Sequence, residues 1–236
     1  MAGESLANDL SARLAEIERA LDAGSYRPGP WEKFLAEARR RPDAERAALA
    51  GDVSRVSRKL HLRGGRSTIP FGAALAAEVV AAVIGGMLVI KGATAPSIVA
   101  AWIGAVLWMM AFQPLVKIAA GAALGVGYEY AYLMGIEPRF KMRYGSYLAA
   151  PRWNRVVLHL AGTAGSPIGV ILAAEIVATS LPWTAALMRA VFWILVAVNF
   201  IPFVAALFGV RRLGPMRVTD GSGGLAGLEL HEAMRG

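Results

Sequence analysis

The chain has 236 residues, of which 56% are hydrophobic, and its formal net charge is +8. Because it contains no cysteine, disulfides, thiolate metal sites and a cysteine nucleophile are excluded. Three apolar stretches are long enough to cross a bilayer, at about 20 residues per crossing, and Pro182 divides the last of them. The sequence therefore predicts an all-α polytopic membrane protein with about four transmembrane helices, a small membrane-surface β-hairpin and an N-terminal cytoplasmic helical arm.

Residues 1–66 are predicted to form the cytoplasmic helical arm. Apolar residues recur at helical spacing at Leu10, Leu14 and Ile17, and the chain continues as helix after Pro42. This narrow apolar stripe indicates packing on the membrane domain, on the lipid surface or on a partner, and a solvated extension without a ligand is the alternative. No secretory signal is expected, because the first long apolar run is far longer than a cleavable apolar segment.

The transmembrane domain is predicted to cover residues 67–212 and to be followed by a cytoplasmic tail. Its predicted elements, with the tail, are spans at about residues 69–90, 97–126, 154–180 and 184–210, a β-hairpin at 127–150 and the tail at 213–236. Small residues four apart, such as Gly121 with Gly125 and Gly165 with Gly169, are typical of closely packed membrane helices.

Basic residues flank the predicted spans instead of forming one patch. They are Arg55, Arg58, Lys59, Arg63, Arg66, Arg139, Lys141, Arg143, Arg152, Arg155, Arg211, Arg212 and Arg217, whereas the opposite connections carry Lys91 and Arg189. By the positive-inside rule, both termini and the central loop face the cytoplasm, which predicts a multi-pass protein of a bacterial cytoplasmic (inner) membrane. The expected partner of these cations is the lipid bilayer, and no nucleic acid is expected.

The segment 127–150 changes from helical periodicity to alternation. Aromatic residues and methionine alternate with polar or small residues, and GIEP supplies a turn; the alternating set is Tyr128, Tyr130, Tyr132, Phe140, Met142 and Tyr144. This pattern predicts an amphipathic β-hairpin whose aromatic and Met side chains face apolar neighbours while its cations face phosphates. Because an isolated hairpin is marginally stable, we expect it to dock on the helices and to be a candidate peptide-binding element.

Several polar residues lie inside the predicted spans. A charge in hydrocarbon costs about 2.5 to 3.5 kcal/mol, so charged groups there need partners or water and should not face lipid. Gln113 and Lys117 share one helical face, and Pro114 frees the Met110 carbonyl beside them. The intramembrane polar set also includes Glu78, Glu175, His159 and Asn199. Lys117 is expected to form an ion pair with Glu78, Glu175 or Asp220 or to snorkel toward the cytoplasm, and a proton or substrate site is the alternative.

The order of these landmarks resembles the site-2 protease superfamily of intramembrane zinc metalloproteases. QPLVK at 113–117 stands in the place of the family's HExxH motif, and LAGTAGSP at 160–167 resembles its AGP stretch. NFIP at 199–202 resembles Asn-x-x-Pro, and TDG at 219–221 resembles the Asp-Gly that supplies the third zinc ligand. The resemblance covers about residues 97–222 and also implies the membrane-associated sheet between the first two landmarks.

The zinc ligands that the resemblance implies are replaced in this chain. Gln113 and Lys117 stand where two histidines would be, and Pro114 stands where the catalytic glutamate would be. An amide is a poor zinc ligand and an ammonium group is none, so a degenerate site without metal, cofactor or catalytic residues is expected. Zinc would be the cofactor only if this interpretation fails. His159 and His231 are lone histidines and do not restore the site.

Asp220 matches the third zinc ligand, although RRLGPM lengthens the connection before it. We hypothesise that Lys117 pairs with Asp220 and replaces the metal, one cation for another, so that the helices stay together without chemistry.

The resemblance implies a site-2 protease-like pseudoprotease that binds a membrane segment or a partner protein. In the active family an edge strand can pair with an extended substrate, a mode that requires backbone groups and no metal. The alternatives are a structural subunit of a larger membrane complex, a transporter using Glu78, Lys117 and Glu175, and an active intramembrane metalloprotease with an unconventional site.

Overall fold

The computed structural model of the chain describes residues 2–65, 67–134, 137–210, 212–218 and 221–235. It divides into two compact units. The arm domain comprises Met1–Ile69 and Gly125–Pro151, and the membrane domain comprises Pro70–Leu124 and Arg152–Gly236. The predicted domain boundaries differ from this division, because residues 127–150 were assigned to the transmembrane part and cluster with the arm instead.

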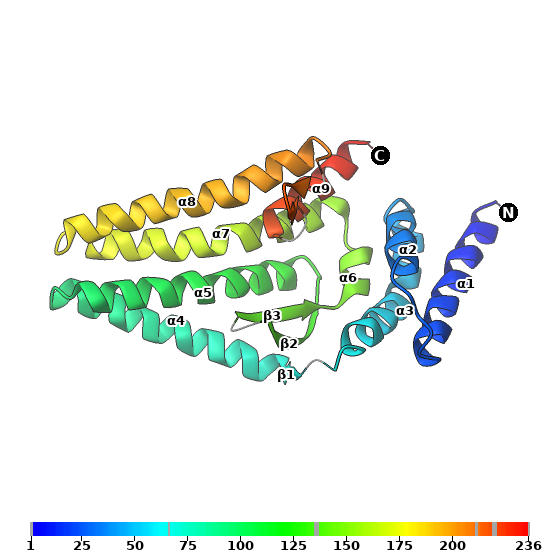
Figure 1. Cartoon of the computed structure of the whole chain (residues 1–236), viewed down its shortest axis with the longest axis horizontal. Helices are drawn as coiled ribbons and strands as arrows, with labels where there is room; N and C mark the ends of the chain where they lie inside the picture. Colours follow the sequence, from blue (N-terminus) through cyan, green and yellow to red (C-terminus); the bar gives the residue numbers. More distant parts are fainter. Residues whose placement is uncertain (1, 66, 135–136, 211, 219–220, 236) are drawn as a thin grey trace. The chain divides into compact units, whose positions relative to one another are not determined.

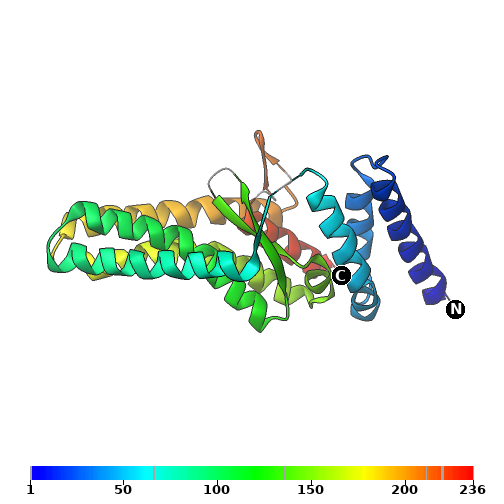
Figure 2. The same cartoon turned by 90° about the horizontal axis from the view of Figure 1, so that it is seen from below.

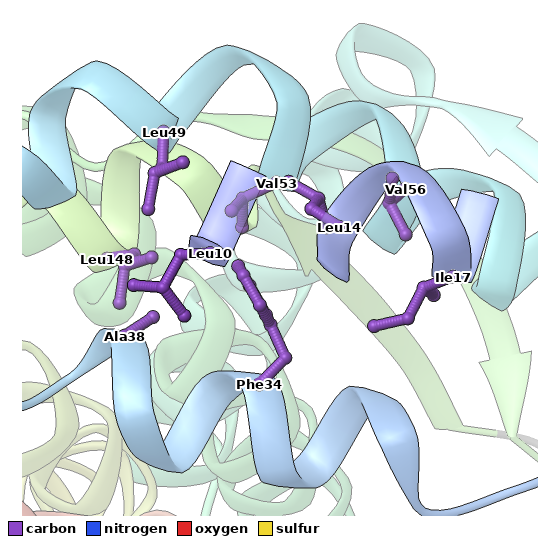
Figure 3. Packing of buried hydrophobic residues seen from close by; sticks show 9 residues of the cluster. All are labelled: Leu10, Leu14, Ile17, Phe34, Ala38, Leu49, Val53, Val56 and Leu148. Atoms are coloured by element: carbon purple, nitrogen blue, oxygen red, sulfur yellow. The ribbon is translucent and has the colours of Figure 1, made fainter. Parts of the chain in front are cut away.

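The arm domain is built from helices that enclose their own core. Its helices are α1 (Ala2–Asp22), α2 (Pro30–Ala38), α3 (Asp43–Leu62) and the short α6 (Tyr144–Ala149). Figure 3 shows the predicted apolar positions of α1 packed against residues of α2 and α3, and the core consists of Leu10, Leu14, Ile17, Phe34, Ala38, Leu49, Val53, Val56 and Leu148. The narrow stripe of α1 is therefore buried against other helices of the arm domain, a packing that differs from those expected.

The short helix α6 joins this core by a very close approach to α3. The Gly145 amide donates to Ser54 Oγ at 3.0 Å. A Cβ atom at Gly145 would lie 1.7 Å from the Ala50 carbonyl oxygen, so only glycine permits the contact. Tyr144 begins α6 and is not part of a strand. The hydroxyl of Tyr144 accepts a hydrogen bond from Arg39 at 2.8 Å, which ties α6 to α2.

The arm domain also carries a sheet with the strand order β1-β2-β3, formed by β1 (Thr68–Pro70), β2 (Tyr128–Met134) and β3 (Glu137–Met142). A bulge between Tyr128 and Tyr130 shifts the antiparallel register of β2 and β3, so that Tyr130 opposes Lys141 and Tyr132 opposes Arg139. Opposed residues share a face of the sheet. The predicted separation of aromatic residues from cations is wrong at two positions, because one inserted residue moves Tyr130 and Tyr132 onto the cationic face, whereas Tyr128 still opposes Met142.

The membrane domain contains four helices that are long and apolar enough to cross a bilayer, counted over the described residues. They are α4 (Phe71–Thr94), α5 (Ile98–Ala123), α7 (Arg152–Val177) and α8 (Pro182–Leu207). Their ends lie within four residues of the predicted spans. The predicted fold class is thus confirmed: the protein is an all-α, multi-pass membrane protein with a small sheet.

The four long helices form two hairpins whose short connections make neighbours antiparallel (Figures 1 and 2). Helices α5 and α7 lie at the centre, α4 packs on α5, and α8 packs on α7. Glycines set the close approaches: a Cβ at Gly165 would lie 2.5 Å from the Phe112 carbonyl oxygen, and one at Gly104 would lie 2.6 Å from the Gly85 carbonyl oxygen. Small residues thus allow backbone contact between these helices, as predicted for Gly165 and Gly169.

The segment predicted as a cytoplasmic tail is structured and packs on the bundle. A two-residue hairpin, β4 (Arg212–Leu213) and β5 (Met216–Arg217), leads into α9 (Ser222–Arg235). In Figure 1, α9 lies across one end of α7 and α8. The backbone of α8 touches α9 at glycines four apart, since Cβ atoms at Gly223 and Gly227 would each lie 2.2 Å from the carbonyl oxygens of Asn199 and Phe203.

Candidate functional site: a polar junction of four helices

Lys117 lies near the C-terminal end of α5, where α5 meets α7 and α9. Its Nζ atom donates to Ser222 Oγ at 3.3 Å, at the first residue of α9. A Cβ atom at Gly162 of α7 would lie 3.0 Å from Lys117 Cδ and 3.2 Å from Ser222 Oγ. The bare backbone of α7 at Gly162 therefore makes room for the lysine chain and its hydroxyl partner.

Gln113 and Pro114 lie one turn earlier, against the same helix. The backbone of Gln113 contacts Gly165, and the hydroxyl of Ser166 donates to the Met109 carbonyl at 2.8 Å. This hydrogen bond lies one residue before the Met110 carbonyl that Pro114 deprives of its helical partner. The stretches QPLVK and LAGTAGSP thus pack directly on each other. Asp220, the predicted partner of Lys117, lies outside the described residues.

An ion pair between α7 and α9 lies deepest in this region. Arg155 Nε donates to Glu229 Oε2 at 2.8 Å, and the two side chains are 1% and 2% exposed. His159, one turn along α7 from Arg155, is also buried. Arg152 adds a longer contact of 3.4 Å to the Glu232 carbonyl. These groups make α9 an integral part of the bundle.

Asn199 and His231 complete the region at α8. The Asn199 amide donates to the Leu195 carbonyl at 2.8 Å within the helix. His231 Nδ1 lies 2.8 Å from the carbonyl oxygen of Leu207, the last residue of α8. Because a carbonyl oxygen only accepts, Nδ1 carries the proton and caps the end of α8. We call the set Lys117, Arg155, His159, Asn199, Ser222, Glu229 and His231 the polar junction.

The other predicted intramembrane charges lie elsewhere. Glu78 is buried in α4. Glu175 forms a two-pronged ion pair with Arg189 of α8, with both nitrogen–oxygen distances at 2.9 Å, and its side chain is 55% exposed. Glu175 therefore has a partner, as expected for a charge in a span, but the partner is Arg189 and not Lys117. Glu175 lies two residues before the end of α7 at Val177.

In the predicted peptide-binding hairpin, the side chains of Tyr130, Tyr132 and Lys141 contact another element of the arm domain, the helix α3. The ring of His61 lies 4.4 Å from that of Tyr132 and 5.6 Å from that of Tyr130, and Lys141 Nζ donates to Ser57 Oγ at 2.8 Å. Burial raises the pKa of the Tyr128 phenol well above its ordinary value. The face that carries Tyr130, Tyr132 and Lys141 therefore packs on α3. Tyr128 opposes Met142 on the other face of the sheet. In the described sheet β1 and β3 are the two outer strands, and β3, with six residues, is the longer of them.

Sequence reasoning missed the buried pair of the polar junction. The sequence pattern groups Arg155 with the basic residues beside a span and places Glu229 in the predicted C-terminal tail. The available signals were the four-residue spacing of Gly223 and Gly227, which indicates a close helix contact, and the position of Arg155 one turn before His159 on one face of α7.

The polar junction brings cations, one carboxylate, an amide and imidazoles together between helices. Among the described residues, no group of three or more His, Asp or Glu side chains is placed to hold a metal ion. The described side chains of the polar junction form hydrogen bonds and one ion pair between helices. These contacts fix α9 against α5, α7 and α8. Comparisons of this chain with protein-family models, with curated proteins and with solved structures found no match.

Proposed function

We propose that this protein is a membrane-embedded binding protein without proteolytic activity, built like a site-2 protease, that holds an extended segment of a membrane protein along β3. The observation that carries the proposal is the position of Lys117, whose ammonium group lies at the contact of α5, α7 and α9 beside Ser222. In the resemblance, this is where a zinc ligand would stand. The ammonium charge would repel a divalent ion in the same pocket. Such an ion would also lack the ligand that a histidine at position 117 would supply.

The binding mode is supported by the strand order. With β2 paired to both neighbours, β3 presents its outer backbone edge along Glu137–Met142. An extended peptide can add to such an edge through main-chain hydrogen bonds, and this needs no metal. Leu133 on β2, which is 59% exposed, offers an apolar contact near the turn.

Metal analysis of the purified protein tests whether the pocket around Lys117 holds the zinc that proteolysis by this mechanism would need. We expect the wild-type chain to hold no stoichiometric zinc, and the triple variant Gln113→His, Pro114→Glu, Lys117→His to gain zinc affinity if the pocket is a former metal site. One tightly held zinc per wild-type chain, or peptide hydrolysis abolished by Lys117→Ala, would overturn the proposal.

Photocrosslinking tests the binding mode. A photoreactive residue in place of Met142 on β3 should capture a defined peptide segment next to a transmembrane helix, identified by mass spectrometry of the adduct. The same residue in place of Arg58, which is exposed on α3, is the matched control. Equal capture at both positions would argue against pairing at β3.

We also propose that one end of the bundle, the end at which α4 begins and α8 ends, faces the cytoplasm of a bacterial inner membrane. The short connections at 95–97 and 178–181 place the start of α4, the end of α5, the start of α7 and the end of α8 at one end of the bundle. Arg152, Arg212 and Arg217 lie at this end, and the positive-inside rule assigns it to the cytoplasm.

Because the chain has no cysteine, a single thiol reports this orientation directly. Thr179→Cys in the connection between α7 and α8 should react with a membrane-impermeant maleimide in spheroplasts. Arg40→Cys in the arm domain should react only after lysis. The reverse pattern would assign the opposite orientation.

A further inference from the structure

The connection between α8 and α9 forms a small cationic arm that the proposed function does not use. We call residues 212–217 the basic hairpin. Its two strands pair antiparallel, and Gly214 turns the chain with φ of 61°. In Figure 2 the basic hairpin, drawn in orange, points sideways from the axes of the long helices. In a bilayer crossed by these helices, such an arm extends along the membrane surface.

Its depth follows from the length of α8. The helix has 26 residues and is about 39 Å long at ~1.5 Å per residue. The hydrocarbon core is only about 30 Å thick. A helix of this length that is centred in the core extends about 4 to 5 Å past each side, which places the end of α8 and the basic hairpin that follows in the headgroup layer. Phe208 and Val210, which are 78% and 41% exposed, continue the apolar surface of the helix into this layer.

The register of the hairpin places two positive charges side by side. Arg212 is the cross-strand partner of Arg217, so their side chains share one face, and both are exposed. Leu213, which is 39% exposed, belongs to the other face, so the hairpin has a cationic face and an apolar side chain opposite it.

We propose that the basic hairpin binds the phosphate of an anionic phospholipid between Arg212 and Arg217. Guanidinium groups bind phosphate oxygens through paired, charge-assisted hydrogen bonds, and two of them on one face of a hairpin can bind the same phosphate. A phospholipid fits better than an acidic protein, because the site lies at headgroup depth beside Phe208, Val210 and Leu213, which can contact acyl chains. This site is independent of the peptide proposed to bind β3.

Native mass spectrometry of the full chain in neutral detergent tests this proposal, with phosphatidylglycerol as the probe and phosphatidylcholine as the uncharged comparison. We expect the wild-type chain to retain phosphatidylglycerol preferentially. The double variant Arg212→Gln, Arg217→Gln should lower the apparent affinity for phosphatidylglycerol at least fivefold and leave phosphatidylcholine unchanged. Arg40→Gln, Arg58→Gln, which removes the same charge from exposed positions of the arm domain, is the control and should retain wild-type affinity.

Equal affinity of the hairpin variant and the wild type would overturn the proposal, as would an equal loss in the control, which would indicate a general effect of net charge. If the double Gln variant fails to fold, Arg212→Lys, Arg217→Lys keeps the charge but loses the paired hydrogen bonds. It should weaken phosphatidylglycerol binding by a smaller factor, and unchanged binding would again count against a phosphate clamp.

Discussion

Arg155 on α7 and Glu229 on α9 form an ion pair in which 2.8 Å separates Nε from Oε2, and both side chains are almost completely buried. The pair of Arg189 and Glu175 has nearly the same separation, 2.9 Å, but both of its side chains are largely exposed. The two pairs therefore share their chemistry and differ in burial. Breaking a buried pair leaves an uncompensated charge between helices, whereas an exposed charge regains water.

The first prediction compares these two pairs. Glu229→Gln should lower the stability of the protein by about 3 to 5 kcal/mol, because it leaves Arg155 buried without its counterion. Glu175→Gln should cost clearly less, because both side chains of that pair are largely exposed. Thermal unfolding in detergent, followed by circular dichroism, measures both. Similar losses in the two variants would contradict the account, and the double change Arg155→Met, Glu229→Leu should recover much of the lost stability.

The second prediction concerns the contact of α5 and α7. A methyl group added at Gly165 would meet the Phe112 carbonyl oxygen and Gln113 Cα at 2.5 Å, and these backbone atoms cannot rotate away. Gly165→Ala should therefore destabilise the protein by about 1 to 3 kcal/mol. Gly72→Ala is the matched control, because a Cβ there meets no atom within 4 Å and alanine favours the helix. The unfolding temperature should fall in the first variant only.

The third prediction concerns a hydrogen bond between α4 and α5. Trp108 Nε1 donates to the Ala82 carbonyl at 2.7 Å. Trp108→Phe keeps an aromatic ring but removes the donor. It should cost about 0.6 kcal/mol, the average for hydrogen bonds between membrane helices, and no more than ~1.7 kcal/mol. Trp193→Phe is the control, because Trp193 is 66% exposed on α8. Equal shifts in unfolding temperature would show that the bond contributes nothing.

The fourth prediction is a pH dependence in the arm domain. Hydrogen bonds from Arg55 and Lys59 on α3 lower the pKa of Glu18 on α1 from 4.5 to about 2. A carboxyl whose folded pKa is depressed stabilises the fold above its unfolded pKa and loses that contribution as pH falls. The attachment of α1 should thus weaken between pH 4.5 and about 2.

Hydrogen exchange of α1 amides, corrected for the intrinsic pH dependence of exchange, measures this weakening. In Glu18→Gln the α1 amides should exchange faster at neutral pH and lose the part of the pH dependence that lies in this window. Because Arg55 is 54% exposed, the effect should be modest, about 1 kcal/mol or less. An unchanged profile in the variant would assign the pH dependence to other carboxyls.

The predicted elements that depend on local pattern agree with the structure. The spans are recognisable because each apolar run must cross a fixed hydrocarbon thickness, and the stripe of Leu10, Leu14 and Ile17 is buried as its helical spacing predicts. The contact of Gly165 with α5 follows from a short-range spacing as well. These features need no knowledge of distant residues.

The candidate site depended on contacts that no local pattern specifies. Glu175 has a sequence environment typical of an interior charge, but Arg189, fourteen residues later, neutralises it at an exposed position. Arg155 and Glu229 are 74 residues apart, and each resembles an ordinary surface charge until α9 folds onto α7. The single-residue bulge beside Tyr128 moved Tyr130 and Tyr132 onto the face that carries the cations, because alternation has a period of two.

The sequence by itself determined that the chain crosses a membrane, where its helices lie, and that glutamine, proline and lysine stand at the centre of one span. Hydropathy and residue identity are local properties, so they can be determined from the sequence without the tertiary structure. Only the tertiary structure decided that Lys117 meets Ser222, that Arg155 is buried against Glu229 and that the C-terminal segment is a packed helix. The physical reason is that burial and charge pairing are properties of surfaces brought together by folding, and their energies depend on which groups exclude water from each other.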